Sequence, residues 1–512
     1  MSRINTNVNS LIAQRVLGAN NKSLSTSLER LSTGLRITRG KDDPAGLIAS
    51  QNLRAEKSSL NQAISNAERA DQVVNIAEGG LDEVSSLLGD LQTLITQTAN
   101  EQGLSREEKE ANQLQIDSII QTIDRVASST SFQGTKLLNG NFDFSTTGVH
   151  SNVQSFKVNS AKIDFGGSRA VDVVVTGSAQ RGAFLLSLGG AIDLSAADAR
   201  FVIEIAGSKG SRELSFASGT TVNSIRDAIN SFTDVTGLSA ATSGTGISLK
   251  SVNFGSDEFV SVRAINTGGL NTAVATAGIY NYQAANNNLA NAGSSTLWSA
   301  ASNKVTDAGQ NVAATINGIV ATTKGTTARI NTDFLDVEID LKTGTGANAE
   351  AQRLGALSAF TITGGGADFQ LAGRVDISGK VSLGIQNIQS NNLGRSRTGG
   401  STYFLQDIGA GRSLNVVDGD IGKAQNVVER AIREVSSLRG RLGAFQKNTI
   451  GATIRSLGVA AENTAAAESS VRDADFASET ASLTRAQILS TSASQILTLA
   501  NSQPQAALQL LG

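Results

Sequence analysis

One feature constrains the fold of this 512-residue chain more than any other: an apolar residue recurs at every seventh position from residue 53 to residue 95. A second set follows three residues after most of these positions, so that steps of three and four alternate. The two sets are Leu53, Leu60, Ala67, Val74, Leu81, Leu88 and Ile95, and Ala63, Ala70, Ala77, Val84, Leu91 and Thr98. A period of about 3.5 residues held this long is typical of a coiled-coil-like helix.

The C-terminal part of the chain repeats the same period. Its two sets are Ile421, Val428, Val435 and Leu442, and Ala424, Ala431, Leu438, Phe445, Ala452 and Val459. A large apolar side chain gains roughly 1.5–3 kcal/mol on full burial, so two such seams should pack along each other. The predicted rod seam consists of Leu53, Leu60, Val74, Leu81, Leu88 and Ile95 from the first part and Val428, Val435, Leu438, Leu442 and Phe445 from the second.

Amphipathic helices are also predicted at the two chain ends. Near the N-terminus the apolar residues include Ile4, Val8, Leu11, Leu28, Leu31 and Leu35, mostly at steps of three, four and seven. Near the C-terminus no charged residue follows Arg485, and Leu483, Ala486, Leu489, Ala493, Ile496 and Ala500 form one helical stripe. A further helix should begin at the Ser105/Glu108 capping box and bury Ile116, Ile119, Ile120, Ile123 and Val126.

Between residues 140 and 415 the pattern changes to strands. Alternating runs such as "AVDVVVTG", "ARFVIEIAG", "FVSVRAI" and "DFLDVEIDL" are separated by Gly, Ser, Thr and Asn. The stretch "SGTTVNSIRDAINSFTDVTGLSA" is predicted to be strand–helix–strand on one small sheet. The predicted fold class is therefore α+β: a long coiled-coil-like helical rod built from both chain ends, with β-rich inserted outer domains.

The sequence offers little for catalysis. It has no Cys and a single histidine, His150, so thiolate sites and two-histidine metal sites are excluded. The motif G-x-G-x-x-A at residues 344–349 is better explained as a glycine-rich turn than as a dinucleotide loop, because no βαβ series surrounds it. The pairs Asp42–Asp43 and Asp473/Asp475 lie near predicted helix ends, where Asp caps helices. No enzyme activity, cofactor or metal is expected.

Charge and hydropathy give no sign of nucleic-acid or membrane partners. The net charge is −2, and no run of some twenty apolar residues occurs. The N-terminus also lacks the pattern of a secretory signal peptide. By these ordinary signals the protein would be cytosolic.

Both ends of the chain resemble bacterial flagellins. The residues are "INTNVNSLIAQRVLGANNKSLSTSLERLSTGLRITRGKDDPAGLIAS" and "TIDRVASSTSFQGTKLLNG" at the start, and "RLGAFQKNTIGATIRSL" and "ESSVRDADFASETASLTRAQIL" with "LQLLG" at the end. The stretch "GGGADFQLAGRVDISGKVSLGIQNIQSNNLG" resembles the β segment of the family's inner rod domain. These stretches stand in the family's order and cover about the first 140 and the last 95 residues.

The resemblance implies a structural subunit that self-assembles into the flagellar filament for motility. It implies three domains: residues 1–40 with 470–512 as the terminal inner-tube domain, 41–160 with 366–469 as the helical rod domain, and 161–365 as β-rich outer domains of one or two modules. Filament assembly would then rest on Ile4, Val8, Leu11, Leu28, Leu31, Leu35, Leu483, Leu489, Ile496, Leu497, Leu508 and Leu511. The chain ends are expected to be disordered in the monomer and to order on assembly.

The implied partners are copies of the chain itself, an export chaperone, the filament cap and hook-associated proteins. Export through the flagellar channel without a cleaved signal peptide would reverse the cytosolic prediction and place the protein in the extracellular filament. The alternatives are a hook–filament junction protein and a flagellin whose insert acts in surface adhesion. Exposed Ser and Thr of the outer domain could also carry O-glycans.

One family feature is changed in this chain. Many flagellins are sensed by an innate immune receptor through a basic residue, a leucine and a glutamate, and the matching positions here are Asp90, Leu94 and Gln115. Only Leu94 fits, and Asp90 reverses the sign of the first contact. The sequence therefore predicts weak receptor recognition.

Overall fold

The structure, a computed structural model, describes residues 6–100, 103–164, 166–195, 198–270, 277–281, 295–344, 352–398 and 401–509. The side chains of residues 398 and 504–509 are not included in that description. Most of the G-x-G-x-x-A motif, Ile4, Leu511 and the side chain of Leu508 therefore lie outside the described part. The chain forms two compact units, which are Met1–Asn75 with Phe369–Lys380 and Gly440–Gly512, and Ile76–Asp368 with Val381–Arg439.

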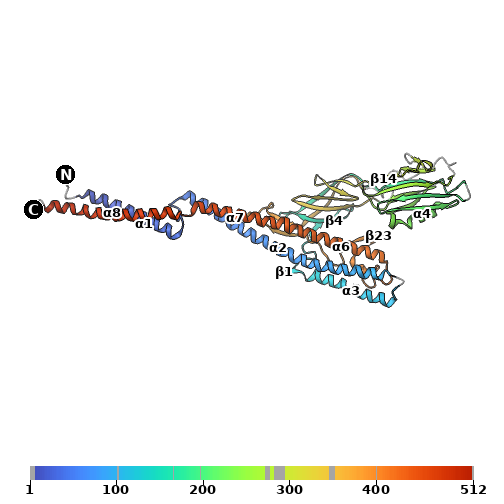
Figure 1. Ribbon diagram of the computed structural model, residues 1–512, viewed down its shortest axis with the longest axis horizontal. Coiled ribbons are helices and arrows are strands. Elements are labelled where there is room, and N and C mark those ends of the chain that lie inside the picture. Colours follow the sequence, from blue (N-terminus) through green and yellow to red (C-terminus); the bar gives the residue numbers. More distant parts are fainter. Residues whose placement is uncertain are drawn as a thin grey trace. The chain divides into compact units, whose positions relative to one another are not determined.

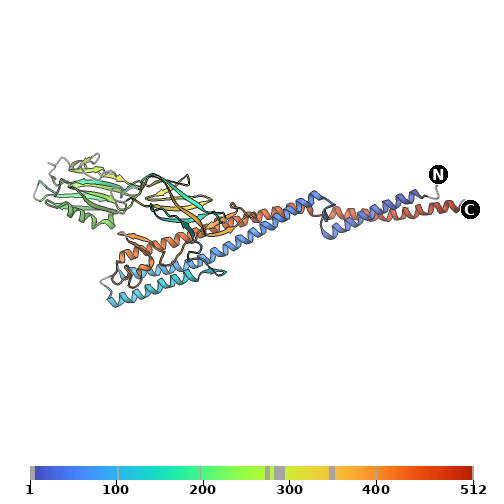
Figure 2. The ribbon, with the colours of Figure 1, turned by 180° about the vertical axis from the view of Figure 1, so that it is seen from behind.

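The first unit is helical. It contains α1 (Val8–Thr33), the first part of α2 (Pro44–Thr98), α7 (Gly451–Arg472) and α8 (Phe476–Gln509), with a π-helix at Phe445–Ile450 before α7. The Asn7 side chain caps α1 by accepting a hydrogen bond from the Ser10 N–H, and Gly34 ends the helix in a left-handed conformation (φ 73°). The helices α1 and α8 lie side by side in both ribbon views (Figures 1 and 2).

The second unit contains a helical part built from the rest of α2, α3 (Arg106–Ser129) and most of α6 (Ile421–Ala444). The predicted capping box begins α3, because Ser105 Oγ accepts from the Glu108 N–H and the Glu108 carboxylate accepts from the Ser105 N–H. Small elements follow: β1 (Ser131–Phe132) with β2 (Thr135–Lys136), β21 (Ala367–Gln370) with β22 (Lys380–Leu383), β23 (Ser396–Thr398) with β24 (Ser401–Tyr403), and η4 (Leu405–Ile408).

An inner β-sandwich in this unit has its own core. One sheet has the order β16-β15-β5-β20-β3 and the other the order β17-β18-β19-β4. The strands are β3 (Phe144–Thr147), β4 (Val153–Ala161), β5 (Arg169–Gly177), β15 (Ala313–Ile316), β16 (Ile319–Val320), β17 (Thr322–Lys324), β18 (Thr327–Asn331), β19 (Leu335–Leu341) and β20 (Gly355–Gly365). In β19 every second residue is buried, so one face meets the core and the other carries Asp336, Glu338 and Asp340.

An outer β-sandwich is inserted between β5 and β15. Its sheets have the orders β13-β12-β6-β10-β9 and β14-β11-β7-β8. The elements are β6 (Ala183–Ser187), β7 (Arg200–Ala206), β8 (Ser211–Ala217), α4 (Val222–Asn230), α5 (Thr233–Thr236), β9 (Leu238–Ser243), β10 (Gly246–Ser251), β11 (Phe259–Asn266), β12 (Gly278–Asn281), β13 (Ser295–Leu297), η2 (Trp298–Ala300) and β14 (Val305–Ala308). Its core surrounds Trp298, whose indole ring packs edge-on against Phe201 at 5.1 Å.

The structure corrects one prediction in this region. The strands that flank α4 were expected on one small sheet, but β8 and β9 belong to different sheets. Ile225 and Ile229 of α4 are buried in the core that both sheets share, so the helix closes one side of the sandwich. The predicted α+β class, with helices at the chain ends and strands between them, is confirmed. No described helix is long and apolar enough to span a membrane.

Candidate assembly interface

The contact between α1 and α8 is made mainly by small residues. The buried positions are Ser10, Ala13 and Ser27 in α1, and Ala486, Ala493 and Ala500 in α8. The three alanines are seven residues apart, and Ser27 lies fourteen residues after Ala13. The seam therefore follows a heptad period, but its side chains are too small to form a wide core. Half-buried Leu17, Leu24, Leu31, Leu483 and Leu497 widen the contact.

Polar bonds fix the register of this helix pair. They are Asn7 Nδ2 to Ala500 O (2.7 Å), Ser10 Oγ to Asn501 Oδ1 (2.7 Å), Asn20 Nδ2 to Leu489 O (3.1 Å) and Ser490 Oγ to Asn21 Oδ1 (2.7 Å). Arg30 and Glu479 add an ion pair at 3.7 Å. Directional bonds between helices specify one alignment where small apolar residues alone would allow sliding.

Many of the large apolar side chains of the pair face outward. Val8, Leu11, Ile12, Val16, Leu28, Ile488, Leu489, Ile496 and Leu499 are each between 43% and 63% exposed. Some of them line a groove of about 420 Å³ with Asn9, Ala13, Ala493, Ala500 and Gln503. Exposed apolar surface that runs along a whole helix pair marks an interaction site.

The predicted assembly residues divide accordingly. Val8, Leu11, Leu28, Leu489 and Ile496 are exposed, while Leu31, Leu35, Leu483 and Leu497 are half-buried. The C-terminal stripe divides in the same way: its alanines are buried in the seam, whereas Leu489 and Ile496 are exposed, because a heptad seam is narrower than an amphipathic stripe. Ser10, Asn20 and Ser27 were missed since they are polar; the seven-residue spacing of the C-terminal alanines was the available signal.

The rod seam is different in character. Val74, Leu81, Leu88 and Ile95 are fully buried, as are Val428, Val435, Leu438 and Leu442, while Leu53 and Leu60 are half-buried. Phe445 is half-buried, and its ring lies 6.3 Å from that of Phe369. The predicted continuation of the seam to Val459 is wrong, because that residue is 59% exposed. A π-helix has more residues per turn than an α-helix, and it begins at Phe445, so the heptad phase is lost there.

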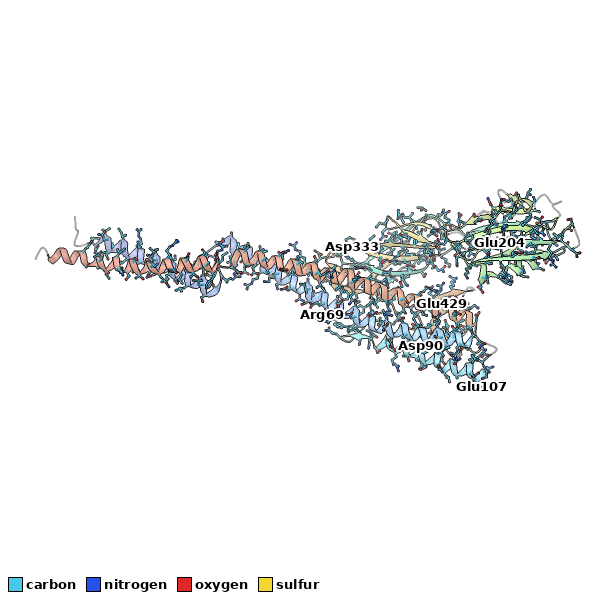
Figure 3. All side chains as sticks on the ribbon, in the orientation of Figure 1. Arg69, Asp90, Glu107, Glu204, Asp333 and Glu429 are labelled. Carbon is cyan, nitrogen blue, oxygen red and sulfur yellow. The ribbon has the colours of Figure 1, made fainter. Side chains whose placement is uncertain are left out.

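Charged residues lie on the surface of this rod and outside its buried seam. Arg439 of α6 reaches Glu78 and Asp82 of α2, each at 2.9 Å, and the hydrogen bonds that its guanidinium donates to the Glu78 carboxylate chiefly raise the pKa of Arg439. Asp90 and Gln115 are exposed and Leu94 is half-buried. Figure 3 shows Asp90 on α2 and Glu107 at the start of α3, in the same helical part.

The residues considered for catalysis have structural roles. Asp42 accepts hydrogen bonds from the Arg39 backbone N–H and from the Thr38 hydroxyl, and these bonds lower its pKa. Asp43 accepts from the Gly46 N–H at the start of α2, and Asp475 accepts from the Ala477 N–H at the start of α8. His150 Nδ1 accepts from the Asn152 N–H in a turn. Among the described residues no cluster of His, Asp or Glu is arranged to hold a metal ion.

The two ends of the chain thus pair as helices along a thin seam, and comparison with known proteins identifies the family. Three family models match: the bacterial flagellin N-terminal helical region over residues 4–143, the bacterial flagellin C-terminal helical region over 425–511, and the flagellin hook IN motif over 200–253. The chain is 27% identical to flagellin A of Helicobacter pylori and 28% identical to a flagellin of Salmonella typhimurium, over 99% of both chains in each case.

A hook-associated protein-3 of Legionella pneumophila aligns in structure over 81% of this chain and 97% of its own, with 12% identity, but its TM-score of 0.28 carries no argument. The chain belongs to the bacterial flagellin family. It is accordingly a structural subunit of the extracellular flagellar filament and not an enzyme.

Proposed function

We propose that this chain polymerises into the filament through the outward faces of α1 and α8. The observation that supports the proposal is the inverted packing of the pair, with small residues inside and large apolar residues outside. A helix pair meant to stand alone in water would place its leucines and isoleucines in the seam. Here those side chains stay available for other copies of the chain.

The energetics favour association. Each exposed Leu, Ile or Val of the pair gains roughly 1.5–3 kcal/mol when a neighbour covers it fully. After Arg485 no charged side chain lies on α8, so close packing of many copies would bury no unpaired charge there. Several such contacts per subunit together contribute more free energy than the subunit loses in rotational and translational freedom on binding.

Seeded growth of the purified monomer tests the proposal. Wild-type chain should elongate seeds into long tubes under the electron microscope. Ile496→Asp should not, because it places a carboxylate in the uncharged stripe. The matched control is Val320→Asp, which alters an apolar residue that is 80% exposed on β16. Equal growth of the two variants would refute the role of the terminal pair.

We further propose that the two ends are disordered in the monomer and become ordered on assembly. The seam between α1 and α8 is thin, so the isolated pair gains little from its own packing. Limited proteolysis of monomer and filament would compare them: cleavage within α1 and α8 should be fast in the monomer and suppressed in the filament. Equal protection in both would contradict the proposal.

We also propose that three parts of the chain have separate roles in the filament. They are residues 1–40 with 470–512, residues 41–160 with 366–469, and residues 161–365. The first part would form the inner tube, the second the rod and the third the outer surface. The two separate β cores agree with two modules in the outer part. In the inner β-sandwich, β3 pairs with β20 and β4 pairs with β19, so this core also includes strands from the proposed rod part.

Family membership supports the remaining partners. We propose that an export chaperone, the cap and hook-associated proteins handle this chain, and that it leaves the cell without loss of an N-terminal segment. Intact-mass measurement of filament protein would detect both cleavage and O-glycans.

A junction role predicts few copies per cell, whereas a filament subunit should be abundant. Adhesion by the insert would survive loss of motility.

Receptor recognition is proposed to be weak. Asp90 and Gln115 are exposed, so a receptor could reach them, but Asp90 carries the wrong charge for a site that accepts a basic residue. A reporter-cell assay with purified monomer should show little activation, and Asp90→Arg should increase it. Strong activation by the wild-type chain would contradict the proposal.

A further inference from the structure

A cavity of about 550 Å³ lies in the second unit, apart from the terminal helices. Its walls come from β3 and the residues beside it, from β4 and β19, from residues 386–395 and from α6. Figure 1 labels β4 and α6. This volume is within the range of about 300–1,000 Å³ that small-molecule sites occupy. Nothing in filament assembly through α1 and α8 requires it.

Charges of both signs line the cavity. The cations are Lys157, Arg395 and Arg430, and the carboxylates facing them include Glu338, Asp340 and Glu434. Among the described residues none of these six groups lies within 4.0 Å of an opposite charge. Lys157 and Glu338 are cross-strand neighbours, yet their side chains make no hydrogen bond or ion pair with any described residue.

The positive and negative side chains nevertheless influence each other across the cavity. Burial raises the pKa of Asp340, while Arg395 and Arg430 act to lower it. Burial likewise raises the pKa of Glu434, against the effect of Lys157 on the opposite wall. Each carboxylate is also held in place, Asp340 by the Thr326 hydroxyl at 2.6 Å and Glu434 by the Gly394 N–H at 2.9 Å. The groups are thus fixed and complementary, but too far apart to pair.

The geometry limits what could fill this space. A simple anion would meet four carboxylates, since Asp143 also lines the cavity, and a simple cation would meet three positive groups. A sugar usually needs an open aromatic ring, but Phe144 is 8% exposed and Phe156 stacks on Phe360 at 4.4 Å. A molecule with one ammonium and one carboxylate would satisfy both sets at once and bring no net charge.

We propose that this cavity binds a zwitterionic solute of the size of an amino acid or dipeptide. Its carboxylate would lie between Lys157 and Arg395, and its ammonium would lie against Glu338 and Asp340. The site goes beyond the structural role of the chain, and it would let the filament respond to small solutes of its surroundings.

Titration calorimetry on the full-length monomer tests the proposal. The probes are 6-aminohexanoate and glycylglycine, with hexanoate, hexylamine and methyl glucoside as comparators. The two zwitterions should bind saturably, and the singly charged comparators at least about tenfold more weakly, as expected when one charge-assisted contact is lost. No saturable binding of either zwitterion, or equal binding of hexanoate, would overturn the proposal. Tighter binding of methyl glucoside would replace it with a sugar site.

Variants locate the site. Lys157→Met and Glu338→Gln should each weaken zwitterion binding about tenfold or more. Both residues lack partners in the described structure, so the variants should fold, which circular dichroism would check. The matched control is Lys324→Met, which removes an exposed lysine that pairs with Asp257 and does not line the cavity. Unchanged affinity in both cavity variants would assign the binding elsewhere and refute the site. The comparator series needs no variant and decides the ligand class by itself.

Discussion

The two helical parts of this chain share a heptad pattern and use it in opposite ways. In α2 the seam positions Leu81, Leu88, Leu91 and Ile95 have no exposed surface, and α3 and α6 supply buried residues of their own. In the pair of α1 and α8 the seam holds Ser and Ala, and the larger side chains face outward. The rod helices therefore bury their apolar core within one chain, whereas the pair of α1 and α8 leaves apolar side chains exposed for other chains to cover.

The difference shows that periodicity and residue size answer separate questions. The heptad period determines which positions face the partner helix. The size of the residues at those positions determines whether one partner is enough, since small seam residues leave the larger neighbours uncovered. The same heptad pattern can therefore serve a rod that folds within one chain. It can equally serve a pair of terminal helices whose large side chains are buried only on assembly.

The largest effect should come from truncation in the complete core. Leu88→Ala should lower the free energy of unfolding of the monomer by about 2–5 kcal/mol, because it leaves a cavity in a fully buried seam. Leu11→Ala removes the same atoms from a side chain that is 58% exposed, and should change the monomer by less than about 1 kcal/mol. Urea unfolding followed by circular dichroism measures both. Equal losses would break the comparison.

Assembly should reverse the order of these two variants. Leu11→Ala should raise the critical concentration for polymerisation about tenfold or more, because a side chain that other copies cover is lost. Leu88→Ala should raise it less, at temperatures where the monomer remains folded. Light scattering of seeded growth gives the critical concentration. If Leu11→Ala grew like the wild-type chain, its outward face would not be an interface.

The thin seam predicts intolerance of larger residues. Ala493→Leu should destabilise the pair of α1 and α8 by about 1–3 kcal/mol, because the added atoms push the helices apart. Ile496→Leu keeps the volume of an exposed residue and serves as the control. Hydrogen exchange of the α1 amides in the assembled filament should speed up only in the first variant. Unchanged exchange would mean that the helices are not held by this seam.

Helix caps offer a smaller contrast. Ser105→Ala should cost about 0.5–2 kcal/mol, since it removes the hydroxyl that accepts the Glu108 N–H. Ser105→Asp restores an acceptor and is the control. Asn7→Ala at α1 removes a similar cap, together with the bond to Ala500. Its effect should be local fraying, visible in hydrogen exchange but not in the main unfolding transition. A shift of that transition would show that the terminal pair unfolds with the rod.

The sequence predicted the parts of the fold in which residue size and periodicity agree. The seam of α2, the capping box at Ser105 and the strands β5, β7 and β19 follow directly from local patterns. The pairing of β8 and β9 with different sheets depends on contacts between distant segments, which a single sequence does not encode locally. The π-helix at Phe445 was also missed, because no residue there breaks the apolar repeat.

The candidate interface was predicted in location and not in packing. Hydrophobicity marked Leu11, Leu489 and Ile496, and these residues do belong to the outward face. It gave no weight to Ser10 and Ser27, whose small size makes them seam residues. The charges around the 550 Å³ cavity lie on β4, β19, α6 and the loops before β3 and β23, so their meeting is a product of the tertiary fold alone.

The smallest expected effect is a pH dependence of stability. It concerns α6, which carries the half-buried Glu434, and not the pair of α1 and α8, whose seam buries no carboxylate. Burial raises the pKa of Glu434 above its usual value of 4.5, so the folded chain holds this proton more strongly than the unfolded chain does. Stability from this group is therefore present at low pH and is lost as pH rises through the raised pKa. Glu434→Gln should be more stable than the wild-type chain at neutral pH, and the difference should shrink as pH falls towards 4.5. Glu429→Gln on the same helix breaks an ion pair with Arg433 at 3.6 Å and should give no such gain (Figure 3). Urea unfolding across this range measures both variants; a gain that persisted unchanged at acid pH would come from packing rather than from the proton.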